Sequence, residues 1–136
     1  MVDPDVESLL STVLSALAER HGLAAAYLFG SVARGEGRAG SDLDVGVLYS
    51  SEPPATLDGL GFDLQGDLEA AVGRAVDLVV LNRAPIDLVM RVLRDGVILL
   101  DRDRSRRIRF EVRSRNEYWD LEPYLRLYRR QGATGA

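Results

Sequence analysis

The chain has 136 residues, of which 46% are hydrophobic and 28% charged, as is typical of one globular domain. It contains no cysteine, which excludes disulfides, thiolate zinc sites and a cysteine nucleophile. The sequence shows neither a secretory leader nor an apolar run of membrane-spanning length, so we expect a cytoplasmic protein without membrane contact. We expect a single domain over residues 1–130 and a disordered tail over residues 131–136.

The charge is divided unevenly along the chain. Residues 1–101 carry seven Arg and sixteen acidic residues, a net charge of −9, whereas residues 102–136 carry ten Arg and five acidic residues, a net charge of +5. Such asymmetry marks either a contact surface for nucleic acid or protein, or a solvated helix face, and the sequence leaves both open. Aromatic residues interleaved with these arginines could stack on nucleic acid or bind a protein, but we favour packing on the domain.

The first predicted element is a helix that begins at Pro4, with Asp3 as its capping residue, and ends at Gly22. Apolar residues recur at helical spacing between these signals. Two apolar runs follow, over residues 23–29 and 43–49, and each predicts a buried strand.

Helical and strand patterns alternate in the rest of the chain. They predict a helix over 56–72, a strand over 75–81 that is buried on both faces, a helix from Pro85, a short strand over 97–100 and an arginine-rich helical segment over 102–130. Pro123 should kink or restart the last helix, with Glu122 as a boundary. We therefore expect an α/β (α+β) fold with a small mixed sheet of about four strands flanked by helices.

A turn rich in glycine, serine and arginine connects the first two predicted strands. Gly30 would let the backbone approach a phosphate. Ser31 would begin a short helix whose free backbone N–H groups bind phosphate oxygens, and its hydroxyl could donate a further hydrogen bond. Arg34 and Arg38 could neutralise the charge of a bound phosphate group; a surface salt bridge is the alternative for Arg34. The turn therefore predicts a site for an anion.

Acidic residues stand beside this turn. Asp42 and Asp44 are two positions apart where the second strand begins, so their side chains should share one face. Close carboxylates repel one another unless a cation lies between them, and oxygen ligands of this kind suit Mg²⁺. Ser41 is placed to orient a carboxylate. Asp77 interrupts the third predicted strand, where a carboxylate without a basic partner needs a metal or another partner.

The compound string Gly-Ser-x-Ala-Arg-Gly…Ser-Asp-x-Asp, in which Gly30 and Ser31 precede the Asp-x-Asp of 42–44 by ten residues, resembles the signature of DNA polymerase β-type nucleotidyltransferases. The fuller string resembles the minimal nucleotidyltransferase (MNT) branch, and the resemblance covers residues 23–100 and, more loosely, the C-terminal helix. The resemblance implies a polymerase β-like nucleotidyltransferase fold and ATP as substrate. It also implies two Mg²⁺ ions held by the Asp-x-Asp and by a third carboxylate from the neighbouring strand, for which Asp77 is the candidate.

MNT proteins of this size resemble antitoxins encoded beside a HEPN-domain ribonuclease toxin, some of which transfer AMP to a tyrosine of that toxin. The resemblance therefore implies a protein adenylyltransferase that neutralises a HEPN toxin and forms a hetero-oligomer with it. Two alternatives remain: a nucleotidyltransferase for RNA or for a small molecule such as an aminoglycoside, and an antitoxin that acts by binding alone. We expect residues 102–130 to dock the partner; a contact with nucleic acid stays open.

Overall fold

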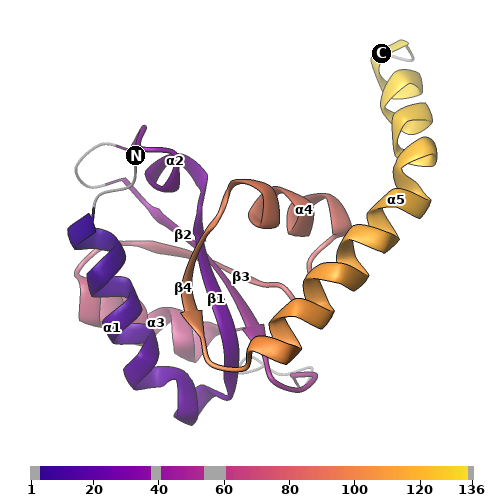
Figure 1. Ribbon diagram of the computed structural model, residues 1–136. Coiled ribbons are helices and arrows are strands. Elements are labelled where there is room, and N and C mark those ends of the chain that lie inside the picture. Colours follow the sequence, from indigo (N-terminus) through magenta and orange to yellow (C-terminus); the bar gives the residue numbers. More distant parts are fainter. Residues whose placement is uncertain (1–3, 38–40, 54–60, 135–136) are drawn as a thin grey trace.

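The structure is a computed structural model that describes residues 4–37, 41–53 and 61–134. Helices and strands follow one another along the chain (Figure 1). They are α1 (Pro4–His21), β1 (Leu23–Phe29), α2 (Gly30–Ala33), β2 (Leu43–Tyr49), α3 (Phe62–Val72), β3 (Val76–Val80), α4 (Ile86–Asp95), β4 (Val97–Asp101) and α5 (Arg104–Thr134). Among the described residues, no helix carries an apolar stretch sufficient to cross a bilayer.

The four strands form one mixed sheet in the order β3-β2-β1-β4. β1 pairs antiparallel with both β2 and β4, whereas β2 and β3 run parallel. The predicted fold class, a small mixed sheet of about four strands flanked by helices, is therefore confirmed. The bounds of β1 and β2 are those predicted from their apolar runs.

Helices cover both faces of the sheet. One core joins α1 and α3 to the sheet and includes Leu10, Leu68 and Leu28. The other joins α4 and α5 to the opposite face and includes Val92 and Phe110. Figure 1 shows these two pairs of helices on either side of the strands. Because β1 is central and covered on both faces, all seven of its residues are buried.

The predicted burial of the third strand on both faces was wrong. β3 stands at the edge of the sheet, and after Val76 its residues are exposed or only partly buried. Asp77 is exposed, so the cost of burying a carboxylate does not apply to it. The predicted helix over 56–72 is described from Phe62 onward, and residues 54–60 lie outside the described residues.

The last helix, α5, is 31 residues long and contains Pro123. It continues past this proline, so a helix boundary at Glu122 was wrong. In Figure 1 the helix changes direction as its colour passes from orange to yellow, which is consistent with the alternative of a kink. The helix is assigned through Thr134 and so enters the segment 131–136 for which we expected disorder.

The aromatic residues of α5 differ in their environment. Phe110 packs in the core, but Trp119 and Tyr124 are each 71% exposed and Tyr128 is 76% exposed. Packing on the domain was therefore the wrong prediction for these three side chains. Figure 1 shows the reason, since the C-terminal half of α5 projects away from the sheet.

A network of polar side chains fixes the beginning of α5 to the sheet. Arg107 donates to Asp101 at 2.9 Å and to Glu111 at 3.1 Å, and Glu111 also accepts a hydrogen bond of 2.7 Å from the Tyr27 hydroxyl. Burial, reinforced by this bond to the Glu111 carboxylate, raises the pKa of Tyr27 far above its usual range. The phenol therefore remains a donor at physiological pH.

Arg107→Leu should lower the free energy of unfolding by about 2 kcal/mol, because it leaves partly buried carboxylates without their donor. The side chains of Arg107 and Glu111 are only 12% and 14% exposed. Urea unfolding followed by circular dichroism measures the change. Arg109→Leu, at an exposed position of the same helix, is the matched control and should change stability by less than about 0.5 kcal/mol. Equal effects of the two substitutions would contradict the role of the network.

Candidate active site

A pocket of about 420 Å³ opens where β1, α2, β2, β3 and α4 meet. Five residues predicted from the sequence line it together, although they come from three separate segments. Its lining consists of Phe29, Gly30, Ser31, Arg34, Asp44, Asp77, Val79, Leu88 and Arg91. The fold therefore brings the predicted anion-binding turn and two of the predicted carboxylates to one place.

The register of the sheet places the two carboxylates side by side. Phe29 at the end of β1 pairs with Asp44 of β2, and Asp44 pairs with Asp77 of β3. Residues directly opposite each other on neighbouring strands present their side chains on the same face of a sheet. The turn that follows Phe29 must therefore leave the sheet beside Asp44.

Gly30 sits directly against the Asp44 carboxylate. Its φ is +76°, in the left-handed region that other residues seldom adopt. A Cβ atom added there would lie 2.8 Å from Asp44 Cγ and overlap Oδ2. Glycine is thus required here by backbone conformation and by the close approach of the carboxylate. The short helix α2 begins at this residue, one position earlier than predicted.

The ionised form of Asp44 is disfavoured in the pocket by burial and by neighbouring negative charges. Its pKa is raised, first by burial and then by the negative charges of Asp77 and Asp42, while the Arg34 guanidinium opposes the shift. Ionised Asp44 is thus less stable in the folded protein than in the unfolded chain. A cation placed between these carboxylates would remove the repulsion.

Comparison with known proteins decides the family. The model of the family described as "Polymerase beta, Nucleotidyltransferase" matches residues 12–105. The chain is 36% identical over 93 residues to protein adenylyltransferase MntA of Thermococcus cleftensis, which covers 68% of this chain and 91% of MntA. This protein belongs to the polymerase β-type nucleotidyltransferase family. The resemblance seen in the sequence is therefore confirmed.

Two solved structures show the same nucleotidyltransferase fold. One is a toxin–antitoxin complex with AMP-PNP, with a TM-score of 0.77 at 24% identity over 90% of this chain and 98% of the other. The second is a tri-AMPylated Shewanella oneidensis HEPN toxin in complex with an MNT antitoxin. It matches with a TM-score of 0.73 at 22% identity, over 93% of this chain and 98% of the other. The predicted polymerase β-like fold is thereby confirmed.

Nucleotidyltransferases of this family are expected to hold a divalent cation, and the pocket fits one. Asp44 and Asp77 together offer carboxylate oxygens beside space for phosphates, which is how Mg²⁺ is usually bound. Asp42 is exposed and acts on Asp44 through its charge, but it does not line the pocket. No group of three or more acidic, histidine or cysteine side chains in the described ranges is arranged to hold a metal ion. A three-carboxylate set for two ions stays a prediction.

The other residues predicted for the nucleotidyltransferase site are Arg34, Ser41 and Arg38. Arg34 lines the pocket, and its Nε also lies 3.1 Å from Glu36 Oε2, so both of its predicted roles are compatible with the structure. The backbone carbonyl of Ser41 accepts a hydrogen bond from Arg74, while the orienting role of the Ser41 hydroxyl stays a prediction. Arg38 lies outside the described residues.

Arg91 of α4 was missed by the sequence analysis. It lines the pocket with Asp44 and Asp77, and the neighbouring Leu88 contributes an apolar wall. The one signal in the sequence was that Arg91 is the only charged residue in the apolar run 88–93. Helical periodicity assigned that run to the core and could not show that one face of the helix borders the nucleotidyltransferase site.

Proposed function

We propose that this protein transfers AMP from ATP to a tyrosine hydroxyl group of a cognate HEPN ribonuclease toxin and thereby neutralises the toxin. The observation that carries the proposal is the register pair Asp44–Asp77 beside the Gly30 turn. The family supplies the reaction class, and the relative MntA is named a protein adenylyltransferase. The structural neighbours include an MNT antitoxin bound to an AMPylated HEPN toxin, which supports the partner.

Each predicted residue has a role in the proposed reaction. Gly30 and Ser31 would bind the phosphates of ATP through backbone N–H groups and the hydroxyl. Asp44 and Asp77, which line the pocket, would hold Mg²⁺ together with Asp42, and Arg34 would neutralise phosphate charge. The roles of Arg38 in phosphate binding and of Ser41 in orienting a carboxylate stay predictions from the sequence. The bound cations would offset the phosphate charge and lower the pKa of the acceptor hydroxyl.

The reaction forms one bond and breaks one. The acceptor oxygen bonds to the α-phosphorus of ATP as the bond from that phosphorus to the bridging oxygen breaks, and pyrophosphate leaves with that oxygen. Asp77 is exposed at the edge strand, within the pocket, and would take the proton of the hydroxyl group. The exposed aromatic residues of α5 favour a protein as the acceptor over a small molecule.

Asp77→Asn tests the proposal. With Mg²⁺, α-labelled ATP and a HEPN-domain toxin as the acceptor, the wild type should label that protein, and EDTA should stop the labelling. The variant should bind ATP within about twofold of the wild type but transfer AMP roughly 100-fold more slowly, since it lacks the proton acceptor. Asp63→Asn, an exposed position on α3, is the control and should transfer normally. Normal turnover by Asp77→Asn would refute the assigned role.

A further inference from the structure

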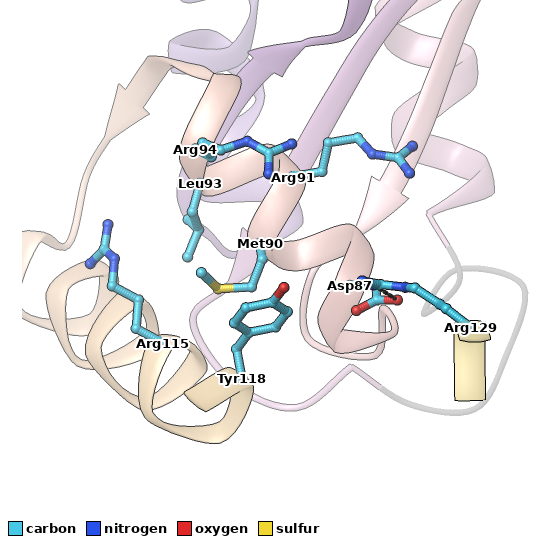
Figure 2. A pocket seen from close by; sticks show the side chains of 8 residues that line it. All are labelled: Asp87, Met90, Arg91, Leu93, Arg94, Arg115, Tyr118 and Arg129. Atoms are coloured by element: carbon cyan, nitrogen blue, oxygen red, sulfur yellow. Dashed lines mark hydrogen bonds and ion pairs between the residues drawn. The ribbon is translucent and has the colours of Figure 1, made fainter. Parts of the chain in front are cut away.

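A second pocket, of about 500 Å³, lies between α4 and α5. Figure 2 shows it from close by, with α4 on one side and α5 on the other. It is lined chiefly by Arg91, Arg94, Arg115 and Arg129, with Met90 and Tyr118 between them. We call it the arginine groove. The concentration of cationic side chains around an apolar floor is unusual for a chain whose net charge is −4.

Two of these arginines are already neutralised. Arg94 Nε lies 3.1 Å from Asp95 Oδ1, and Arg129 Nη2 lies 2.9 Å from Asp87 Oδ2. The second pair joins α5 to α4 across the groove (Figure 2). The positive charge of each of these two arginines is therefore offset by a neighbouring carboxylate.

The other two arginines carry a surplus of positive charge. Arg115 has Glu111 as a partner only at 4.0 Å, and the carboxylate of Glu111 already accepts from Arg107 and Tyr27. In the part of the chain that the structure describes, no hydrogen bond or ion pair is found for Arg91. Both side chains are exposed, so an anion can reach them.

The groove adjoins the candidate active site. Arg91 lines both pockets, the one with Asp44 and Asp77 and the one with Arg115 and Tyr118. A chain segment lying in the groove would therefore pass next to the carboxylates at which the acceptor hydroxyl must react. Since Gly30 and its turn account for the nucleotide phosphates, the groove is free for the acceptor.

We propose that the arginine groove binds an acidic segment of the acceptor protein and thereby holds its reacting hydroxyl beside the active site; this inference rests on the function proposed above. Guanidinium groups bind carboxylates through two parallel hydrogen bonds, so Arg91 and Arg115, which both line the groove, each offer a site for one carboxylate. Met90 and Tyr118 offer apolar surface for the stems of the acidic side chains and for an aromatic ring.

The charge distribution favours an acidic peptide over nucleic acid. Binding to a phosphate backbone needs a broad basic surface, because its affinity comes from many phosphate contacts. Here many arginines of α5 and α4 are paired, as in Arg126–Glu122 and Arg107–Asp101. The surplus of two cations in one groove matches a few carboxylates at defined positions.

Arg115→Glu tests the inference, because Arg115 lines the groove and not the active-site pocket. The probe is a fluorescein-labelled pentapeptide with two glutamates on each side of a tyrosine, and binding is measured by fluorescence anisotropy at low salt. The wild type should bind it, whereas Arg115→Glu should bind about tenfold more weakly. Arg109→Glu changes the charge equally on an exposed part of α5 outside the groove and should bind like the wild type. A peptide with glutamines in place of the glutamates should not bind.

The outcomes separate this inference from the proposed function. Asp44→Asn should lose AMP transfer but keep peptide binding, so the groove is tested without any turnover. Equal binding by Arg115→Glu and Arg109→Glu, or no binding by the wild type, would overturn the inference. Displacement of the peptide from the wild type by a single-stranded oligoadenylate whose own binding depends on Arg115 would also overturn the inference, because the groove would then be a nucleic-acid-binding site. Thermal unfolding of each variant confirms that it is folded.

Discussion

Asp44→Asn should reduce AMP transfer about 1000-fold while leaving the protein at least as thermostable as the wild type in the absence of Mg²⁺. The loss follows because this carboxylate borders both the Gly30 turn and Asp77, and a cation bound there stabilises the transition state by several kcal/mol. The stability follows because the substitution removes a charge that burial and two neighbouring carboxylates disfavour. Initial rates of labelling and melting temperatures measure the two effects.

Magnesium should distinguish the two proteins further. Mg²⁺ should raise the melting temperature of the wild type, because it offsets the repulsion among Asp42, Asp44 and Asp77, and should have little effect on Asp44→Asn. Asp42→Asn should also impair transfer but should raise the melting temperature less, since Asp42 is exposed. A variant that melts far below the wild type would contradict the view that this cluster opposes folding.

The pH dependence has a defined sign. The pKa of Asp44 is raised in the folded state, so the folded protein holds this proton more tightly than the unfolded chain does. Its contribution therefore disfavours folding at neutral pH and is relieved as the pH falls through the raised pKa. The free energy of unfolding of Asp44→Asn should lack this part of the pH dependence. As the pH falls, protonation of Asp44 should prevent Mg²⁺ from stabilising the wild type, and this should happen at a higher pH than for an aspartate of ordinary pKa.

The same variant separates enzymatic from purely steric neutralisation. In cells that express the HEPN toxin, the wild type should restore growth and Asp44→Asn should not, although both should bind the toxin. Full protection by Asp44→Asn would show that the protein neutralises the toxin by binding alone. That result would leave the fold and family unchanged, but it would remove the chemical role assigned to the pocket.

The strands and the central turn could be predicted because local chemistry determines them. Apolar runs over 23–29 and 43–49 are bounded by glycine and polar residues, and their ends are those of β1 and β2. The spacing of the turn and the Asp-x-Asp then places Asp44 beside Gly30 once the two strands pair. Here the local sequence and the tertiary structure agree.

Other features depend on tertiary arrangement that periodicity does not encode. The residues of β3 are apolar as in a central strand, but strand order places them at the edge, where Asp77 is exposed. The aromatic residues of α5 have the spacing of a packed helix, but the C-terminal half of this helix projects away from the sheet (Figure 1), and Tyr124 and Tyr128 are exposed. Arg91 joins the pocket because α4 packs against β1 and α2, a position that no local pattern in the sequence specifies.

Gly30→Ala should lower the free energy of unfolding by about 3 kcal/mol and abolish nucleotide binding. An alanine at a φ of +76° costs about 1–2 kcal/mol, and its Cβ would in addition overlap the Asp44 carboxylate, which must then move. Since that movement displaces the carboxylate expected to hold the cation, nucleotide binding should be lost and the free energy of unfolding should decrease in the same variant. Urea unfolding and calorimetry with a non-hydrolysable ATP analogue measure these losses.

Other glycines of the same chain separate the two causes. Gly73 has a φ of +69° with no atom within 4 Å of an added Cβ, so Gly73→Ala should show the conformational cost alone, about 1–2 kcal/mol. Gly66 lies inside α3 with open space around it, and Gly66→Ala should stabilise the protein by about 0.5–1 kcal/mol.

A double-mutant cycle then isolates the contact between the turn and the carboxylate. Asp44→Ala removes the atoms that an alanine at position 30 would overlap most closely, so the double variant Gly30→Ala/Asp44→Ala should be more stable than the sum of the single effects predicts, by about 1 kcal/mol or more. Additive effects would show that Gly30 serves backbone conformation alone. A positive coupling would instead show that the glycine is needed because the turn predicted to bind phosphate and the carboxylate predicted to bind the cation must lie in direct contact.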